Sequence, residues 1–350
     1  MARNRCILHD GLIATLLLTS LSITQAVANE AEGSFFKGKR VTMLIGSSAG
    51  GGYDVYARLI ARHFGKYIPG NPIVTASNMA GAGSNVAAAF IANSAPKDGT
   101  TIGALYMGAI VEPLFYDKVR STHNPVEFNY IGNANTDYDV CVVRSDAGVN
   151  SLADVFHKEL ILGASAPGGA TYDFPTLLKE LLGAKLKIVS GYPGSREVNL
   201  ALEKGEVQGI CGQSWGGVAA MYEPMIRSGS IKLLAQEAVS GHPSLDRMQV
   251  PLTKEFASSD AQRAVMNLFY QQTSFSRPYV VAKDVPTARV TLLRRAFMDT
   301  MQDKDLREEA RRAQIDVDPT SGEDMQKMLT QLYASPVDQI HAIRKIYAAK

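Results

Sequence analysis

The chain of 350 residues carries 36 basic and 34 acidic side chains, a formal net charge of +2, and 46% of its residues are hydrophobic. This length is ample for two α/β domains of ordinary size, and the composition is that of a globular protein. The near balance of charge argues against a nucleic-acid partner, which calls for a clustered basic face.

The first 28 residues have the features of an export signal. Arg3 and Arg5 precede an apolar run at residues 11–18, and residues 26–28 form an A-x-A cleavage pattern. The run is shorter than the roughly 20 apolar residues that a membrane span needs. We therefore expect cleavage after Ala28 and a mature protein that is soluble in the periplasm.

A glycine loop follows the first strand of the mature chain. Residues 41–45 are apolar and strand-like, residues 46–54 read GSSAGGGYD, and residues 55–61 have helical apolar spacing. Such a loop exposes backbone N–H groups at a helix N-terminus, where the helix dipole favours an anion. We interpret this loop as an anion-binding loop, with a tight turn without ligand as the alternative.

Further strands and helices alternate along the chain, which is typical of parallel sheets with crossover helices. Residues 72–76 and 101–105 are predicted strands, separated by the glycine loop 78–85 and by a helix at 86–92. The pattern restarts after Tyr130 with a strand at 139–143 and another at 160–162.

A second glycine loop resembles the first. Residues 163–173 read GASAPGGATYD and precede a helix predicted at 174–182. The shared order of small residues, glycines and Tyr-Asp suggests two half-molecules that face each other. The remaining predictions are strands at 187–190, 207–212, 231–235 and 274–282, and helices at 197–204 and 287–303, with a capping box at 321–324.

The two cysteines of the mature chain are Cys141 and Cys211. In an oxidising compartment a disulfide between them is the economical interpretation, and two buried free thiols are the alternative.

Enzyme interpretations have weaker support. Residues 46–50 fit the G-x-S-x-G pattern of a serine nucleophile, with Asp173 and His242 as conceivable partners of Ser48. In hydrolases with this pattern the nucleophilic serine normally comes deep in the chain, after several strands. Nothing in the sequence brings Ser48, Asp173 and His242 together. The first loop lacks the third glycine and the G-K-[ST] of nucleotide-binding loops, and the histidines lack metal-ligand spacing, so we expect no cofactor and no metal.

A carboxylate-binding cleft uses the same residues more naturally. N–H groups from both loops can bind a carboxylate, and the hydroxyls of Ser47, Ser48, Ser165 and Thr171 can complete its hydrogen bonds. Asp54 and Asp173 stand where helix-initiating residues cap backbone donors, so capping and ligand contact are equally good interpretations. Aromatic residues at strand-to-helix junctions could line a pocket; these are Tyr53, Tyr106, Tyr172, Tyr192 and Trp215.

The sequence resembles a known family, the Bug-type (TctC-like) periplasmic substrate-binding proteins of tripartite tricarboxylate transporters. The resemblance covers essentially the whole mature chain and rests on five motifs in order. They are AGGGYDVYAR at 49–58, NMAGAGSN at 78–85, APKDG at 95–99, GASAPGG at 163–169 and GYPGS at 191–195.

The resemblance implies a two-domain clamshell of the periplasmic-binding-protein type, each domain having a mainly parallel sheet flanked by helices, with the chain crossing twice between domains. The expected division is domain 1 at 29–136, domain 2 at 137–252, and completion of domain 1 by 253–350. It implies a non-catalytic, monomeric receptor that closes around a small organic (di)carboxylate, which could be aromatic, and delivers it to membrane permease subunits. A membrane sensor is an alternative partner.

The ligand-binding residues expected from the motifs, the hydroxyls and the aromatic positions lie in both halves of the chain. They are Ser47, Ser48, Gly50, Gly51, Gly52, Tyr53, Asp54, Asn78, Gly81, Ser84, Tyr106, Ser165, Gly168, Thr171, Tyr172, Asp173, Tyr192, Ser195 and Trp215. Two departures from the family pattern bear on the ligand: Ala49 stands where proline is common, and the pocket is richer in tyrosine and tryptophan.

Overall fold

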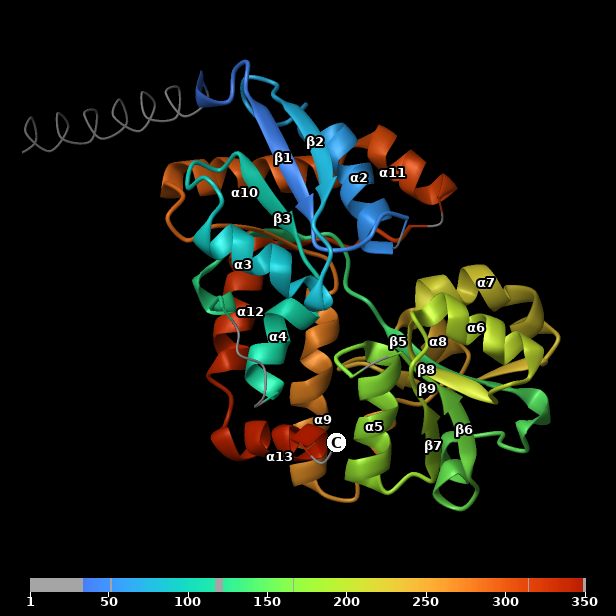
Figure 1. Cartoon of the computed structure of the whole chain (residues 1–350). Coiled ribbons are helices and arrows are strands. Elements are labelled where there is room, and N and C mark those ends of the chain that lie inside the picture. The colour runs from blue at the N-terminus through green and yellow to red at the C-terminus, as the bar shows by residue number, and fades with distance from the viewer. Residues whose placement is uncertain (1–33, 51, 117–121, 166, 314, 349–350) are drawn as a thin grey trace, which may run out of the picture.

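The structure is a computed structural model that describes residues 34–348 except 51, 117–121, 166 and 314. The predicted export signal and Gly51 lie outside the described residues. The described part of the chain forms two lobes, each with its own sheet flanked by helices (Figure 1). The predicted α/β class is therefore confirmed.

The first lobe contains a sheet that has six strands among the described residues, in the order β11-β4-β10-β3-β1-β2. β1 lies parallel to β2 and β3, whereas β10 is antiparallel to both β3 and β4, and β11 is antiparallel to β4. The strands are β1 (Arg40–Ile45), β2 (Ile73–Asn78), β3 (Thr101–Ala104), β4 (Asn129–Asn133), β10 (Pro278–Val281) and β11 (Thr320–Ser321).

Helices from both ends of the described chain cover this sheet. α2 buries Ala57, Leu59, Ile60 and Phe64, whose three- and four-residue spacing gives the helix one apolar face. The first-lobe helices are α2 (Gly52–Phe64), α3 (Asn85–Asn93), α4 (Gly108–Phe115), α10 (Thr287–Met301), α11 (Lys304–Arg312) and α12 (Gly322–Tyr333). Serine caps α12 as the sequence predicts, because the Ser321 hydroxyl accepts a hydrogen bond from the Asp324 N–H.

The second lobe contains a sheet with five described strands in the order β7-β6-β8-β5-β9. β6 is parallel to β7 and β8, while β5 is antiparallel to β8 and β9. Its elements are β5 (Asp139–Arg144), β6 (Leu160–Gly163), α5 (Ala170–Leu182), β7 (Leu186–Val189), α6 (Ser195–Lys204), β8 (Gly209–Ser214), α7 (Trp215–Arg227), β9 (Ile231–Glu237) and α8 (Pro243–Arg247).

Both sheets are mixed, and most strands of each run in one direction, as the predicted fold class expects. The parallel strands are those joined by crossover helices, for example β1, β2 and β3. Two of the strands that run against their sheets stand near the passages between lobes: β5 follows the passage at 134–138, and β10 follows the return.

Two helices lie where the lobes meet. α9 (Asp260–Tyr270) and α13 (Val337–Ala348) pack on each other and on α5 (Figure 1). The Tyr347 hydroxyl of α13 donates a hydrogen bond of 2.9 Å to the Asp173 carbonyl oxygen of α5. The last helix of the chain is thereby anchored to the second lobe.

Short 3-10 segments connect several of these elements. They are η1 (Ala82–Ser84), η2 (Pro125–Glu127), η3 (Ser145–Ala147), η4 (Leu152–Phe156), η5 (Thr253–Phe256) and η6 (Gln271–Phe275). The region predicted as a strand at 274–282 is therefore η6 followed by the shorter strand β10. Nothing in the described residues forms a helix both long and apolar enough to cross a membrane.

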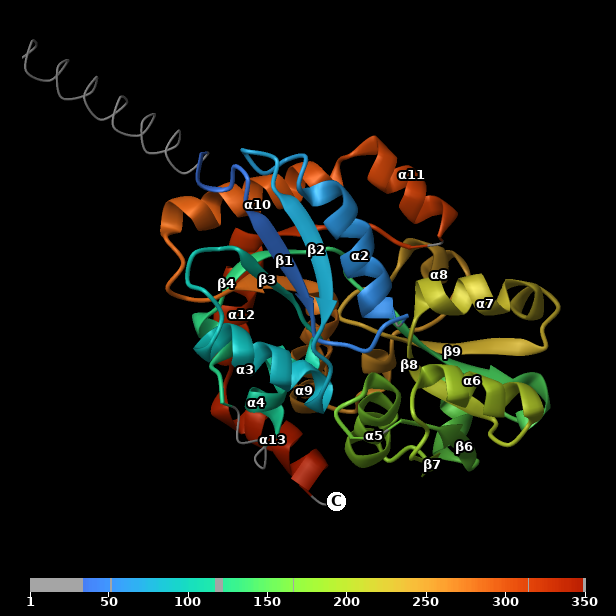
Figure 2. The ribbon, with the colours of Figure 1, turned by 45° about the horizontal axis from the view of Figure 1, so that its top comes forward.

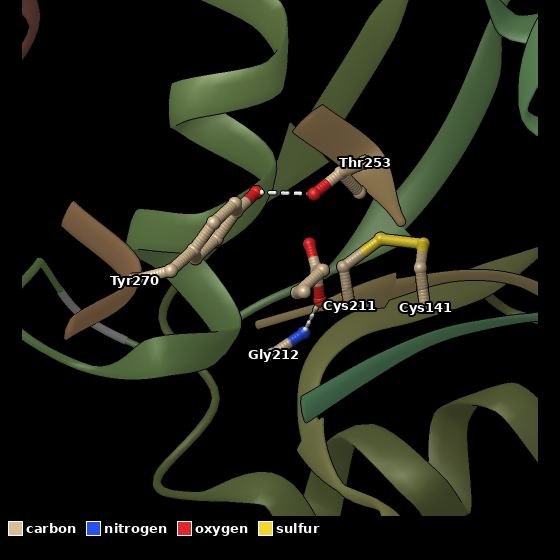
Figure 3. The surroundings of a disulfide bond; sticks show 6 residues. Cys141, Cys211, Gly212, Thr253 and Tyr270 are labelled. Atoms are coloured by element: carbon tan, nitrogen blue, oxygen red, sulfur yellow. Dashed lines mark hydrogen bonds between the residues drawn. A yellow bond between two sulfur atoms is a disulfide. The ribbon is translucent and has the colours of Figure 1, made fainter. Parts of the chain in front are cut away.

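Cys141 and Cys211 form a disulfide between neighbouring strands β5 and β8 (Figure 3). Both cysteines are buried. Of the two interpretations left open by the sequence, the disulfide is the one that the structure contains.

Candidate functional site

The first glycine loop joins β1 to α2 and is directed at the second lobe (Figure 2). It packs closely on the loop after β2, because a Cβ atom built on Gly46 would lie 1.6 Å from Ser84 Oγ. Gly50 has φ of 83°, a conformation that suits glycine, and its N–H donates a hydrogen bond of 2.9 Å to Asp54 Oδ2. Ser48 is exposed at the tip of the loop, whereas Ser47 is buried.

Asp54 holds this loop in shape. Its buried carboxylate also accepts hydrogen bonds from Arg58 Nε at 2.9 Å and from Asn78 Nδ2 at 2.7 Å. The Asn78 amide donates a second bond, of 2.9 Å, to the Ser47 carbonyl oxygen. Although burial opposes it, these hydrogen bonds lower the pKa of Asp54. The capping interpretation of Asp54 accounts for its observed contacts, and direct ligand contact stays a prediction.

The second glycine loop, between β6 and α5, repeats this construction. Gly168 has φ of 89°, and its N–H donates to Asp173 Oδ1 at 3.1 Å, as Gly50 does to Asp54. Thr171 fixes the start of the loop, because its Oγ1 accepts the Ser165 N–H at 3.0 Å and lies 2.8 Å from Ser165 Oγ. The two motifs that look alike in sequence thus share one hydrogen-bond plan.

The loop before α6 lies beside the second glycine loop. The Gly191 N–H donates to the Ser165 carbonyl oxygen, and the Tyr192 N–H donates to the Ala164 carbonyl oxygen, both at 3.3 Å. Ser195 is exposed at the first position of α6. The structure therefore brings the motifs at 163–173 and 191–195 together at one edge of the second sheet.

The two lobes approach each other at Glu112, a residue of α4 that the sequence analysis did not identify. A Cβ atom built on Gly168 would lie 2.8 Å from Glu112 Oε1, and Cβ atoms built on Gly108 and Gly83 would lie 3.1 Å and 3.3 Å from it. Asn85 Nδ2 donates a 2.9 Å hydrogen bond to Glu112 Oε2. Burial raises the pKa of Glu112. The available signal was a single charged residue in the apolar segment GAIVEPLF at 108–115.

The aromatic residues expected to line one pocket are distributed over several places. Tyr53 and Tyr106 stack with ring centroids 3.9 Å apart, next to the first loop. Tyr172 is buried in α5, and Tyr192 packs against the core of the second lobe. Trp215 begins α7 and lines a cavity of about 910 Å³ between α7, α8 and α11, whose lining includes neither glycine loop.

Arg277 is a second residue that the sequence did not single out. Its guanidinium carbon lies 4.3 Å from the Tyr53 ring centroid and 4.9 Å from that of Tyr56, and its Nη1 is 3.0 Å from Asp137 Oδ2. Burial raises the pKa of Tyr53 to about 12, an effect that the charge of Arg277 opposes. This ion pair sits at the passage between the lobes, and its arginine packs on the ring of Tyr53.

The residues considered for a serine nucleophile are not assembled. His242 Nδ1 accepts a hydrogen bond from the Ser244 N–H, and Asp173 accepts one from Gly168. Across the part of the chain that the structure describes, Ser48 has no hydrogen bond to a histidine.

Two α/β lobes, each with a glycine loop at the start of a helix, have the architecture of a two-lobed ligand-binding protein. The model of the family described as "Tripartite tricarboxylate transporter family receptor" matches residues 56–334, and the chain belongs to this family. This confirms the resemblance noted in the sequence. The family consists of periplasmic solute-binding receptors and not of enzymes.

Curated relatives are distant. A UPF0065 protein from Agrobacterium vitis is 26% identical over 214 residues, and the match spans 59% of this chain and 59% of that protein. A UPF0065 protein from Bordetella bronchiseptica is 25% identical over 252 residues, spanning 67% of this chain and 68% of that protein.

Solved structures share the fold over most of the chain. A TctC solute-binding protein from Polaromonas has a TM-score of 0.67 at 20% identity, covering 89% of this chain and 99% of that one. An R. palustris protein solved with adipate has a TM-score of 0.63 at 21% identity, and the match covers 88% of this chain and 97% of that one. MatC from Rhodopseudomonas palustris, solved with bound malate, has a TM-score of 0.60 at 19% identity, and the match covers 88% of this chain and 98% of that one.

Proposed function

We propose that this protein is a periplasmic receptor that captures a small organic carboxylate or dicarboxylate between its two glycine loops and delivers it to a tripartite tricarboxylate-type permease. The observation that carries the proposal is the shared plan of the loops. In each, an N–H of a positive-φ glycine donates to the aspartate of the following helix, namely Gly50 to Asp54 and Gly168 to Asp173.

This construction favours a carboxylate. Each loop stands at the N-terminus of a helix, α2 or α5, where the helix dipole and unpaired backbone donors favour negative charge. Hydroxyls of Ser47, Ser48 and Ser165 lie in or beside the loops and can complete the hydrogen bonds of a carboxylate. Adipate and malate in the two similar structures support the same ligand class.

The proposed mechanism is closure of the lobes. Residues 137–252 form the moving domain, and residues 29–136 with 253–350 form the other. A ligand that contacts both loops stabilises the closed state by its higher affinity for that state. Export with cleavage after Ala28 and a monomeric receptor complete the proposal; the A-x-A pattern at residues 26–28 supports the cleavage.

The test is a thermal-shift screen of organic acids, followed by calorimetric titration of the hits. A ligand at 100 times its dissociation constant adds about 2.7 kcal/mol to the free energy of unfolding. Gly168→Ala places a side chain at φ of 89° and against Glu112, and it should abolish binding. Gly183→Ala is the matched control, because Gly183 has φ of 75° but nothing within 4 Å of its Cβ position. If no organic acid binds the wild type, the proposed function is wrong.

A further inference from the structure

The carboxylate of Glu112 is a charged group at one of the places where the two lobes come together. Oε1 is the atom nearest to the Cβ positions built on Gly83, Gly108 and Gly168. Gly83 and Gly108 belong to the first lobe, and Gly168 belongs to the second. A Cβ atom on Gly108 would also lie 3.8 Å from the Gly168 carbonyl oxygen. Glu112 therefore stands between the two lobes, next to the second glycine loop.

One oxygen of Glu112 has no hydrogen-bond partner among the described residues. Oε2 accepts the hydrogen bond from Asn85 Nδ2, whereas Oε1 accepts none from any described residue. Within the described ranges, Glu112 also forms no ion pair. The arginines closest to the first loop are engaged elsewhere, Arg58 with Asp54 and Arg277 with Asp137.

This arrangement conflicts with a plain carboxylate ligand. A carboxylate bound to the glycine loops would place its negative charge close to that of Glu112, with no cation between them, and like charges at short range repel. A ligand that carries a positive group beside its carboxylate removes the conflict. Its carboxylate binds the loop N–H groups, and its ammonium group donates to the unpartnered oxygen of Glu112.

We propose that Glu112 is a specificity-determining residue and that the ligand is an aminocarboxylate, with its ammonium group on Glu112 Oε1. The inference rests on the proposed function and adds to it the chemical class of the ligand. Tyr53 and Tyr106 stand beside the first loop with their stacked rings, and they can cover the apolar part of such a ligand.

The experiment compares acids that differ only by an amino group. Wild type is titrated at pH 7 with succinate and aspartate, glutarate and glutamate, and adipate and 2-aminoadipate. We expect at least one amino acid to bind ten times more tightly or better than its matched diacid. Glu112→Gln keeps the size of the side chain and should reduce that preference to less than threefold. Glu180→Gln removes the same charge from an exposed position of α5 and should leave the preference unchanged.

The outcomes separate the two proposals. If diacids bind the wild type as tightly as the amino acids, or if Glu112→Gln keeps the preference, the inference is overturned while the receptor function stands. A diacid that binds more tightly at pH 5 than at pH 7, with the effect lost in Glu112→Gln, would identify a protonated Glu112 that donates to a carboxylate, and it would also overturn the inference. If neither series binds, the proposed function fails.

Discussion

Two buried carboxyl groups should make the stability of this protein depend on pH. Asp139 begins β5 and lies opposite Glu237, the last residue of β9, in the strand register. Both side chains are buried, at 4% and 0% exposure. The Gly212 N–H donates a 2.6 Å hydrogen bond to Glu237 Oε2, and Gly212 directly follows the disulfide-bonded Cys211 (Figure 3). Asp137 and Arg277 are the charged groups that face Asp139.

Burial keeps both groups protonated near neutral pH. It raises the pKa of Glu237 to about 8, against the effect of the Gly212 hydrogen bond, and it raises the pKa of Asp139 to about 8, an effect that the charge of Asp137 reinforces. Between pH 5 and pH 8 the folded protein holds a proton on Glu237 that the unfolded chain has released. The free energy of unfolding must therefore fall as pH rises, by up to about 1.4 kcal/mol per pH unit for this group.

The assay is urea denaturation of wild type and Glu237→Gln at pH 5, 6, 7 and 8, with the disulfide intact. The amide has no proton to release, so the variant lacks the contribution of Glu237. From pH 5 to pH 8 the wild type should lose about 3 kcal/mol more than the variant, on the values above. Histidine titrations occur in both proteins and cancel in the difference. Parallel stability curves for the two proteins would refute a neutral Glu237.

Two further predictions concern the covalent and polar supports of the lobes. The double substitution Cys141→Ser and Cys211→Ser should lower the free energy of unfolding by about 4 kcal/mol, because a crosslink over 70 residues restricts the unfolded chain. Equal urea midpoints for the variant and the oxidised wild type would contradict this prediction. Asp54→Asn should cost about 2 kcal/mol, because the carboxylate accepts hydrogen bonds from Gly50, Arg58 and Asn78, whereas Asp146→Asn at an exposed ion pair should change thermal stability little.

The sequence predicted the parts of this protein that depend on local pattern. The strand, glycine loop and helix at residues 41–64 are recognisable because glycines, apolar periodicity and a helix-initiating aspartate occur within one short segment. The similarity of residues 46–54 and 163–173 likewise corresponds to one hydrogen-bond plan in the structure.

What the sequence did not predict depends on contacts between distant segments. Glu112 is placed by α4 of the first lobe against Gly168 of the second lobe. No local sequence pattern encodes a contact between residues that are so far apart in the chain. Arg277 pairs with Asp137 across the return of the chain to the first sheet. The reversed direction of β5 and β10 follows from the two passages between lobes, which connect segments far apart in the sequence.

The loops themselves give a reason why selectivity should reside outside them. Asp54 and Asp173 fix the two glycine loops before any ligand arrives, so little ordering of the loops is needed on binding. Backbone N–H groups bind any carboxylate and do not distinguish the rest of the molecule. Discrimination must come from side chains that other elements place beside the loops, and Glu112 on α4 is a charged one that contacts neither an arginine nor a lysine among the described residues.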